Sequence, residues 1–296
     1  MRQVLVGVQL VLAIFLISST MLMQRQLNFL QNKDLGFSKE QLAVVQLNTP
    51  RGRMPERIVA GFGKSTQFKS ALAQVPDIAG VCASSHDFGN GAWTQIGYTD
   101  DQGTYRNFNL NIVDADYIAV LRMQLAAGRN FNADNPSDMR RSIIVNEAFM
   151  REMGWDDALG KRLPGKAFSD HEIIGVIKDF NYASLYTRVE PLVMAMDPAL
   201  PLSGTENIMI NNSPVPKLLI RIKPGNMNHT IEEIHQVWDK ITGGEEFAFT
   251  FADQAMAAQY RNDQNLGKIV SLATMLAIII GSLGLYGLAS LAMQTA

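Results

Sequence analysis

The chain has 296 residues, and its 26 basic side chains nearly balance its 28 acidic ones, which leaves a net charge of −2. This balance, without a basic face that carries interleaved aromatic residues, argues against nucleic-acid binding. Cys82 is the single cysteine, so the chain can form neither an internal disulfide nor a multi-cysteine metal site. The apolar residues are unevenly distributed, because apolar runs lie at both ends and an ordinary polar mixture lies between them.

The first element is an apolar run at residues 4–23 that carries no charged side chain. Its length predicts an uncleaved membrane helix; a signal peptide is the alternative, although no typical cleavage site follows the run. Leu27 and Leu30 continue an apolar stripe at helical spacing, which predicts a stalk beyond the membrane. Gly36 can supply the left-handed position that often ends a helix. We therefore expect residues 1–35 to form a first transmembrane helix and its stalk.

The polar middle of the chain predicts two β-α-β units, each a strand, a helix and a second strand. Their six elements are expected at residues 40–47, 64–74, 78–83, 217–222, 227–241 and 247–251. Two such units can pair into one ferredoxin-like layer of sheet and helices. The fold class is therefore α+β.

A second, mixed α/β subdomain is expected between these units, at residues 104–197. Its clearest signals are an alternating strand at 106–113 and a short helix that Asn146 caps and Gly154 ends. Four prolines between residues 198 and 216 predict a long loop. The expected core domain spans residues 36–252, with a first subdomain at 36–103 and 216–252, the inserted subdomain at 104–197 and the loop at 198–215.

The last element is a second uncharged apolar run at residues 269–293, which is long enough to cross a hydrocarbon core of ~30 Å. No proline follows Asp253, so residues 253–296 are expected to form an unbroken stalk and second transmembrane helix. Small residues recur along it at Ala273, Ala277, Gly281, Gly284 and Gly287. This spacing predicts a face that packs closely against the first helix or a second chain; alternatively, glycine and alanine are simply frequent in membrane helices.

Side chains that could perform chemistry are scattered. His86, His171, His229 and His235 lie far apart in the sequence, which predicts no metal site. Residues 84–87 read Ser-Ser-His-Asp, but sequence neighbours rarely form a triad, because its geometry requires residues from separate elements. The chain has no P-loop and no G-x-S-x-G motif. We expect no catalytic, cofactor-binding or metal-binding residues, and no hydrolysis of ATP by this chain.

Short motifs follow one another in a characteristic order. They are QNKDLGF at 31–37, GRNF at 128–131, IVNEAF at 144–149, MGW at 153–155, LGKR at 159–162, IGVIKDFNY at 174–182, EPL at 190–192 and IRIKPG at 220–225. Each motif is weak alone, but the ordered series resembles ABC-transporter permeases of the MacB-like and FtsX-like superfamily. The order is most similar to the second half of the long permeases of Bacteroidetes-type bacteria.

The resemblance implies a multi-pass protein of the bacterial inner membrane, with a periplasmic core domain after the first helix and three further helices after that domain. Because the chain stops within or just after the second helix, we expect it to be a fragment. A reporter fused near Asn135 is expected to be active only when exported. The implied partners are a cytoplasmic ABC ATPase, a second permease chain, the lipid bilayer and a periplasmic or outer-membrane protein.

The implied function is mechanotransmission, in which ATP-driven motion of the membrane helices reaches the periplasmic domain for export or extrusion of drugs, peptides or lipoproteins. The alternative is a two-helix membrane sensor whose outer domain binds a ligand. Further membrane helices after Ala296 would support the permease, and a kinase or a methyl-accepting coiled coil would support the sensor. A membrane-anchored enzyme is a weaker third class, because no site supports it.

Overall fold

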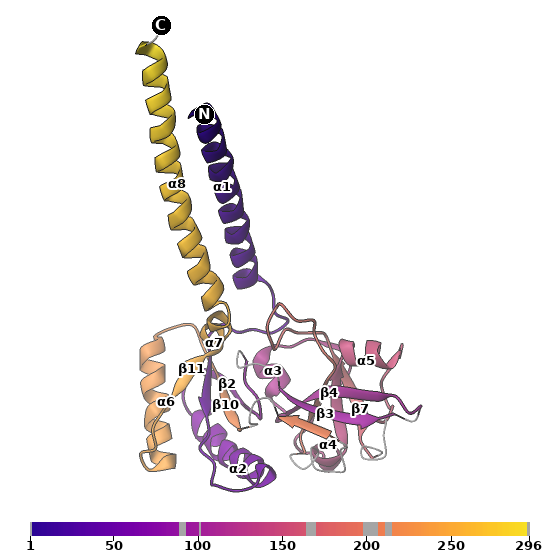
Figure 1. Cartoon of the computed structure of the whole chain (residues 1–296). Helices are drawn as coiled ribbons and strands as arrows, with labels where there is room; N and C mark the ends of the chain where they lie inside the picture. The colour runs from indigo at the N-terminus through magenta and orange to yellow at the C-terminus, as the bar shows by residue number, and fades with distance from the viewer. Residues whose placement is uncertain are drawn as a thin grey trace. The chain divides into compact units, whose positions relative to one another are not determined.

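The computed structural model describes residues 2–88, 93–100, 102–163, 170–197, 207–210 and 215–294. They form two compact units, one of Met1–Lys33 with Ala257–Ala296 and one of Asp34–Met256. We call the first the helical unit and the second the core domain. The helical unit contains α1 (Arg2–Asn32) and α8 (Arg261–Gln294), and the core domain contains two β-sheets (Figure 1).

The first sheet of the core domain is a four-stranded antiparallel layer with the order β11-β1-β10-β2. Its strands are β1 (Leu42–Gln46), β2 (Ile78–Ser84), β10 (Lys217–Ile222) and β11 (Phe249–Phe251). Helix α2 (Met54–Leu72) connects β1 to β2, and α6 (Met227–Thr242) connects β10 to β11. This is the ferredoxin-like arrangement that two paired β-α-β units produce.

Both faces of this sheet are buried, because alternate residues of each strand project to opposite sides. Ala43 and Val45 of β1 pack in one cluster with Phe68 of α2 and Trp238 of α6, whose rings stack 5.0 Å apart. The neighbouring Leu42 belongs to a second cluster, which includes side chains from the other sheet. The sheet is therefore covered by its two helices on one face and is tied to the second sheet through the other.

The second sheet has seven strands in the order β5-β7-β6-β8-β4-β3-β9. They are β3 (Thr94–Thr99), β4 (Tyr105–Ile112), β5 (Leu125–Gly128), β6 (Ser142–Asn146), β7 (Glu172–Ile177), β8 (Leu192–Ala195) and β9 (Asn207–Ile210). Three short helices accompany them, α3 (Tyr117–Leu121), α4 (Pro136–Arg140) and α5 (Glu147–Met153). The sheet is mixed, since β4 and β8 and also β6 and β7 run parallel.

This sheet takes strands from outside the expected insertion at 104–197. β3 precedes that range and pairs with β4, so the glycine-rich stretch before residue 104 contains the first arm of a hairpin. β9 lies within the range 198–215, where a loop is expected. It forms a strand there by pairing with β3, with Ile208 opposite Ile96. Residues 198–206 and 211–214 of that expected loop lie outside the described residues.

The stalk expected to run unbroken from Asp253 is divided. Helix α7 (Ala252–Ala258) ends before α8 begins, and the amide of Tyr260 donates to the carbonyl of Ala257, three residues back instead of four. Met256 is buried in the core domain, which fixes α7 there. Tertiary burial therefore ends a helix that contains neither proline nor glycine.

A buried carboxylate holds the loop between β5 and β6. The Asp138 side chain is fully buried and accepts hydrogen bonds from the Arg129 guanidinium at 2.5 and 2.8 Å. It also accepts from the Asn132 amide at 2.9 Å and the Ser142 hydroxyl at 2.8 Å. The bonds from Arg129, and then those from the amide and the hydroxyl, lower the pKa of Asp138 to about 2.

We expect the core domain to lose stability as the pH falls from about 4 to about 2. The pKa of Asp138 is lower in the folded protein than in the unfolded chain, so its stabilising contribution is complete above the unfolded pKa and disappears as the pH falls through the folded one. Asp138→Asn should cost about 3 kcal/mol at neutral pH, because it leaves Arg129 without its charged partner. Thermal unfolding midpoints from pH 7 downward test this, and an unchanged acid profile in the variant would contradict the assignment.

Candidate functional site

The two helices of the helical unit lie side by side and pack along a narrow seam (Figure 1). In α1, a series of partly or fully buried residues follows spacings of three and four, at Ala13, Leu16, Thr20, Met23, Leu27 and Leu30, and Ser19 beside Thr20 is also partly buried. In α8 the corresponding positions are Gly267, Val270, Thr274, Ala277, Gly281 and Gly284. This spacing is that of a left-handed coiled-coil seam, with mostly bulky side chains on α1 and mostly small ones on α8.

A polar contact lies within this seam. Thr20 Oγ1 and Thr274 Oγ1 are 2.8 Å apart, and each hydroxyl also lies 2.8 Å from the carbonyl oxygen four residues earlier in its own helix. Because a hydroxyl has one proton, one threonine donates to its own helix while the other donates across the pair. Thr274 is buried, so this contact fixes the register of α1 against α8.

The helices approach closely at Gly267, one heptad before Thr274. A Cβ atom added at Gly267 would lie 3.3 Å from both Leu27 Cδ1 and Met23 Sδ. At Gly281, one heptad after Thr274, a Cβ atom would meet no atom within 4 Å. Gly267 precedes the apolar run and is not among the five expected packing residues; its seven-residue spacing from Thr274, repeated at Gly281, is the signal that identifies it.

We expect Gly267→Leu to push the helices apart, because overpacking a close contact costs about 1–3 kcal/mol. The measurement is oxidative cross-linking of a Thr20→Cys/Thr274→Cys pair, whose yield should fall sharply when Gly267→Leu is added. Gly281→Leu is the matched control, since its side chain has space within the pair. Equal yields for Gly267→Leu and the control would contradict a close approach at Gly267.

The five small residues expected as packing candidates divide into two groups. Ala277, Gly281 and Gly284 are partly buried in the helical unit, whereas Ala273 and Gly287 are exposed. Residues spaced strictly four apart do not stay on one face of a helix, because the helix has 3.6 residues per turn. The seam stays on one face because its spacing alternates between three and four. Packing of these residues against a second chain stays a prediction.

Helix α8 has 34 residues and is about 50 Å long, more than the ~30 Å of a hydrocarbon core. Within the described part of the chain, one helical stretch, Arg261–Gly284, is long and apolar enough to cross a membrane. Helix α1 also exposes large apolar side chains, among them Val11, Phe15 and Leu22. A membrane crossing by α1, and therefore two flanking transmembrane helices, stays a prediction.

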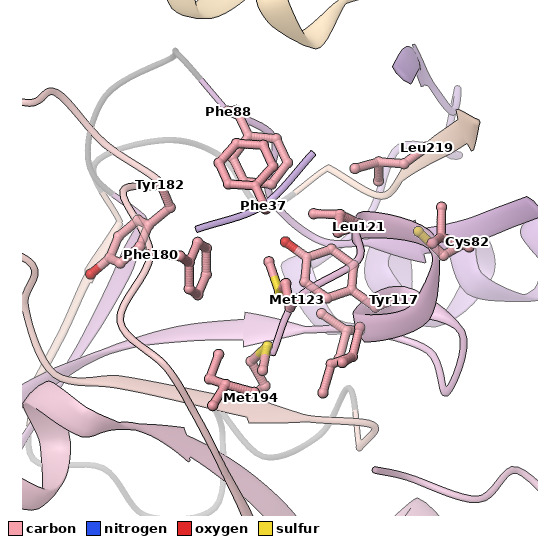
Figure 2. Close-up of a cluster of buried hydrophobic side chains, with 14 of the residues drawn as sticks. Phe37, Cys82, Phe88, Tyr117, Leu121, Met123, Phe180, Tyr182, Met194 and Leu219 are labelled. Atoms are coloured by element: carbon pink, nitrogen blue, oxygen red, sulfur yellow. The ribbon is translucent and has the colours of Figure 1, made fainter. Parts of the chain in front are cut away.

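The first and last segments of the core domain enter one buried cluster. Leu35 and Phe37 follow α1 in the chain, and Ala252 and Met256 belong to α7, which precedes α8. All four side chains are at most 6% exposed. In Figure 2 the ring of Phe37 overlies that of Phe88, and their centroids are 4.2 Å apart. Displacing either end of the core domain therefore requires displacing this cluster.

Gly36 allows the chain to turn into the cluster. Its φ of +84° is the left-handed conformation expected of the residue that ends the first stalk. A Cβ atom there would lie 2.8 Å from the Cβ of Phe180 and 2.9 Å from the carbonyl oxygen of Asp179. The neighbouring Leu35 carbonyl accepts a hydrogen bond of 2.7 Å from the Asn181 amide. The QNKDLGF and IGVIKDFNY motifs therefore meet here, and their residues build the entry to the core.

The serines of the 84–87 stretch form a structural junction between the two sheets. Ser84 Oγ and Ser85 Oγ donate to Asn111 Oδ1 at 2.9 and 3.0 Å. The Ala83 amide donates to the Asp114 carboxylate at 2.9 Å, and the Asp114 amide donates to the Ala83 carbonyl at 3.1 Å. β2 of the first sheet is thereby joined to the end of β4 in the second.

The histidine of this stretch faces a threonine and not a serine–carboxylate pair. His86 Nε2 lies 3.0 Å from Thr94 Oγ1, and the Asp87 carboxylate lies 3.7 Å from the Lys217 ammonium. Burial, and then the charge of Lys217, lower the pKa of His86 to about 3, so its imidazole is neutral at physiological pH. Burial also raises the pKa of the Cys82 thiol. Across the described ranges, no group of three or more His, Cys, Asp or Glu side chains could hold a metal ion.

Comparison with known proteins gives a match to the family model of the MacB-like periplasmic core domain over residues 4–237. The periplasmic region of MacB from Actinobacillus actinomycetemcomitans is 13% identical, with a TM-score of 0.49 and coverage of 77% of this chain and 96% of that one. A domain of a putative permease protein from Porphyromonas gingivalis is 16% identical, with a TM-score of 0.44 and coverages of 73% and 92%. No curated protein sequence matches the chain.

The extracellular domain of the noncanonic ABC-type transporter YknZ from Gram-positive bacteria is a third similar structure. It is 15% identical, with a TM-score of 0.45 and coverages of 70% of this chain and 99% of that one. The family match runs from α1 into α6, so it includes the seven-stranded sheet and β1, β2 and β10 of the four-stranded sheet, and it ends before β11. The chain belongs to the MacB-like periplasmic core domain family.

Proposed function

We propose that the chain is part of a permease subunit that passes ATP-driven motion from the inner membrane to its periplasmic core domain. The observation that carries this proposal is the shared cluster at the two ends of the core domain. Phe37 lies five residues after the end of α1, and Met256 lies five residues before the start of α8. Because a packed core deforms little, a displacement of either helix is passed to the whole domain.

In this proposal α1 and α8 cross the membrane, and a separate cytoplasmic ABC ATPase supplies the energy. A second permease chain completes the transporter, and a periplasmic or outer-membrane protein receives the exported drug, peptide or lipoprotein. The family match favours this function over the two-helix sensor, and the junction between the sheets supports motion of the core domain as one body.

The test is a flexible insertion between helix and core. Gly-Ser-Gly-Ser inserted after Lys33 should leave ATP hydrolysis by the assembled transporter intact while transport falls to background, because the slack absorbs the motion of α1. The same insertion after Arg51, an exposed residue in the loop between β1 and α2, is the control and should preserve transport. Normal transport with the insertion after Lys33, at normal abundance in the membrane, would overturn the proposal.

A further inference from the structure

The core domain contains a cleft of about 540 Å³ that the transmission function does not use. It is bordered by residues of α2, β2, α3 and β10, and its charged lining residues are Lys69, Asp116, Arg122 and Arg221. The volume lies in the range of about 300–1,000 Å³ that small-molecule sites occupy. We propose that this cleft binds a small amphiphilic anion, with its apolar body against the walls and its anionic head at Arg122 and Arg221.

The apolar body follows from the walls. Seven of the eleven lining residues are alanine, glycine, valine or isoleucine. Ala73, Ala79 and Ala119 are exposed, so the short side chains leave apolar surface open at the cleft. An apolar ligand would cover this surface, and burying it contributes about 25 cal/mol per Å².

The anionic head follows from the charges. Lys69 is balanced by Asp114 at 2.7 Å and Asp116 at 2.5 Å. Arg122 and Arg221 have no such balance: among the residues that the structure describes, no carboxylate forms an ion pair with either guanidinium. Lys69 with its two carboxylates carries one negative charge and the two arginines carry two positive charges, so the site keeps one net positive charge, which a carboxylate or similar anion would compensate.

Arg221 is held rigidly by neutral oxygen atoms. It is 4% exposed and donates to the carbonyls of Val120, Glu40 and Ser38 at 2.5, 2.9 and 2.6 Å. A fourth bond reaches the Ser38 hydroxyl at 3.2 Å. A guanidinium has five N–H donors, so one remains for a ligand. Burial, and then the charge of Arg122, lower the pKa of Arg221, so the two guanidinium groups are close enough to repel each other.

Arg122 has a left-handed backbone conformation, which is unusual for arginine. It follows α3 with φ 55° and ψ 38°, the left-handed position where glycine or asparagine is usual. An exposed arginine in this conformation carries backbone strain that glycine would not carry. Strain of this kind is typical of residues kept for binding.

The inference is tested with 4-phenylbutyrate as the probe, added to the purified full chain in lipid nanodiscs and followed by saturation-transfer NMR. Binding should saturate in the millimolar range or below, and the neutral isostere 4-phenylbutyramide should bind about tenfold more weakly. Arg122→Gly should weaken binding of the acid about tenfold without lowering the unfolding temperature, because glycine relieves the left-handed backbone. Arg140→Gln, which removes an exposed arginine on α4, should bind like the unchanged chain.

A second variant separates the cleft from the lipid. Ala79→Leu/Ala119→Leu fills the open walls with apolar side chains and should abolish saturable binding while the chain still folds. Saturable binding that survives this change, equal binding of acid and amide, or equal binding by Arg122→Gly and Arg140→Gln would each overturn the inference. Absence of saturable binding by the unchanged chain would overturn it as well. None of these results depends on transport, so the inference and the proposed function fail separately.

Discussion

Replacing Gly128 by alanine should destabilise the core domain by about 2–5 kcal/mol, the sum of a left-handed backbone and an overpacked contact. Gly128 has a φ of +74°, and a Cβ atom there would lie 2.3 Å from the carbonyl oxygen of Ile174 and 2.8 Å from the Cα of Gly175. These are backbone atoms of the paired strand β7, so they cannot move aside as a flexible side chain could. The GRNF motif begins with glycine because β5 and β7 come too close for any side chain.

Gly160→Ala is the matched control for this prediction. Gly160 has almost the same φ, +72°, but a Cβ atom there would meet no atom within 4 Å. Its replacement should therefore cost about 1–2 kcal/mol, the backbone term alone. Denaturant unfolding of the full chain, followed by tryptophan fluorescence, measures both losses. If the two variants lose equal stability, the close approach of β5 and β7 contributes nothing.

Truncating Phe37 to alanine should cost about 3–5 kcal/mol and should also uncouple the first helix from the core domain. The ring stacks on Phe88 and meets Phe180 edge-on at 6.1 Å (Figure 2), so its removal leaves a cavity in the cluster at the domain's two ends. Such a cavity lets the segment after α1 shift without displacing its neighbours. ATP-dependent transport per folded molecule in the assembled transporter should therefore fall.

Phe88→Ala separates uncoupling from simple loss of stability. Phe88 contributes the other ring of the same stack, but it lies in the interior of the chain and not beside α1. Both variants should lower the unfolding temperature by similar amounts, whereas transport corrected for abundance in the membrane should fall for Phe37→Ala alone. An equal fall in both would show that transport only follows the stability of the cluster.

The ferredoxin-like layer is the part of the fold that local sequence patterns predict best. Each of its elements buries a face that is visible in its own residues, as at Phe68 and Leu72 of α2. The conformation of Gly36 is also predicted by the sequence, because a glycine after a helical apolar stripe indicates a left-handed turn, and its φ confirms this. The order of motifs then indicates the family, which the match over residues 4–237 confirms.

The remainder depends on partners that are distant in the sequence. β5 consists of four exposed residues, so its strand conformation comes from hydrogen bonds to β7 and leaves no apolar alternation. Thr20 and Thr274 are 254 positions apart, and a lone threonine in an apolar run does not indicate which residue it contacts. The sequence likewise does not predict that Arg122 lies beside Arg221, because α3 and β10 meet only in the folded chain.

The pairing of β1 with β11, the first and last strands of the core domain, bears on how such proteins could exchange whole domains. Ala43 is opposite Phe251 in an antiparallel ladder, where facing Cα atoms lie about 5 Å apart. The chain therefore enters and leaves the core domain at two adjacent points, which are as close together as the two strands of a hairpin. A second insertion of this kind lies within the core domain. Ser84 at the end of β2 is opposite Lys217 at the start of β10, and the seven-stranded sheet is formed by the residues between them. Two nested insertions of this kind would let the seven-stranded sheet be exchanged as one block while the flanking segments keep their places.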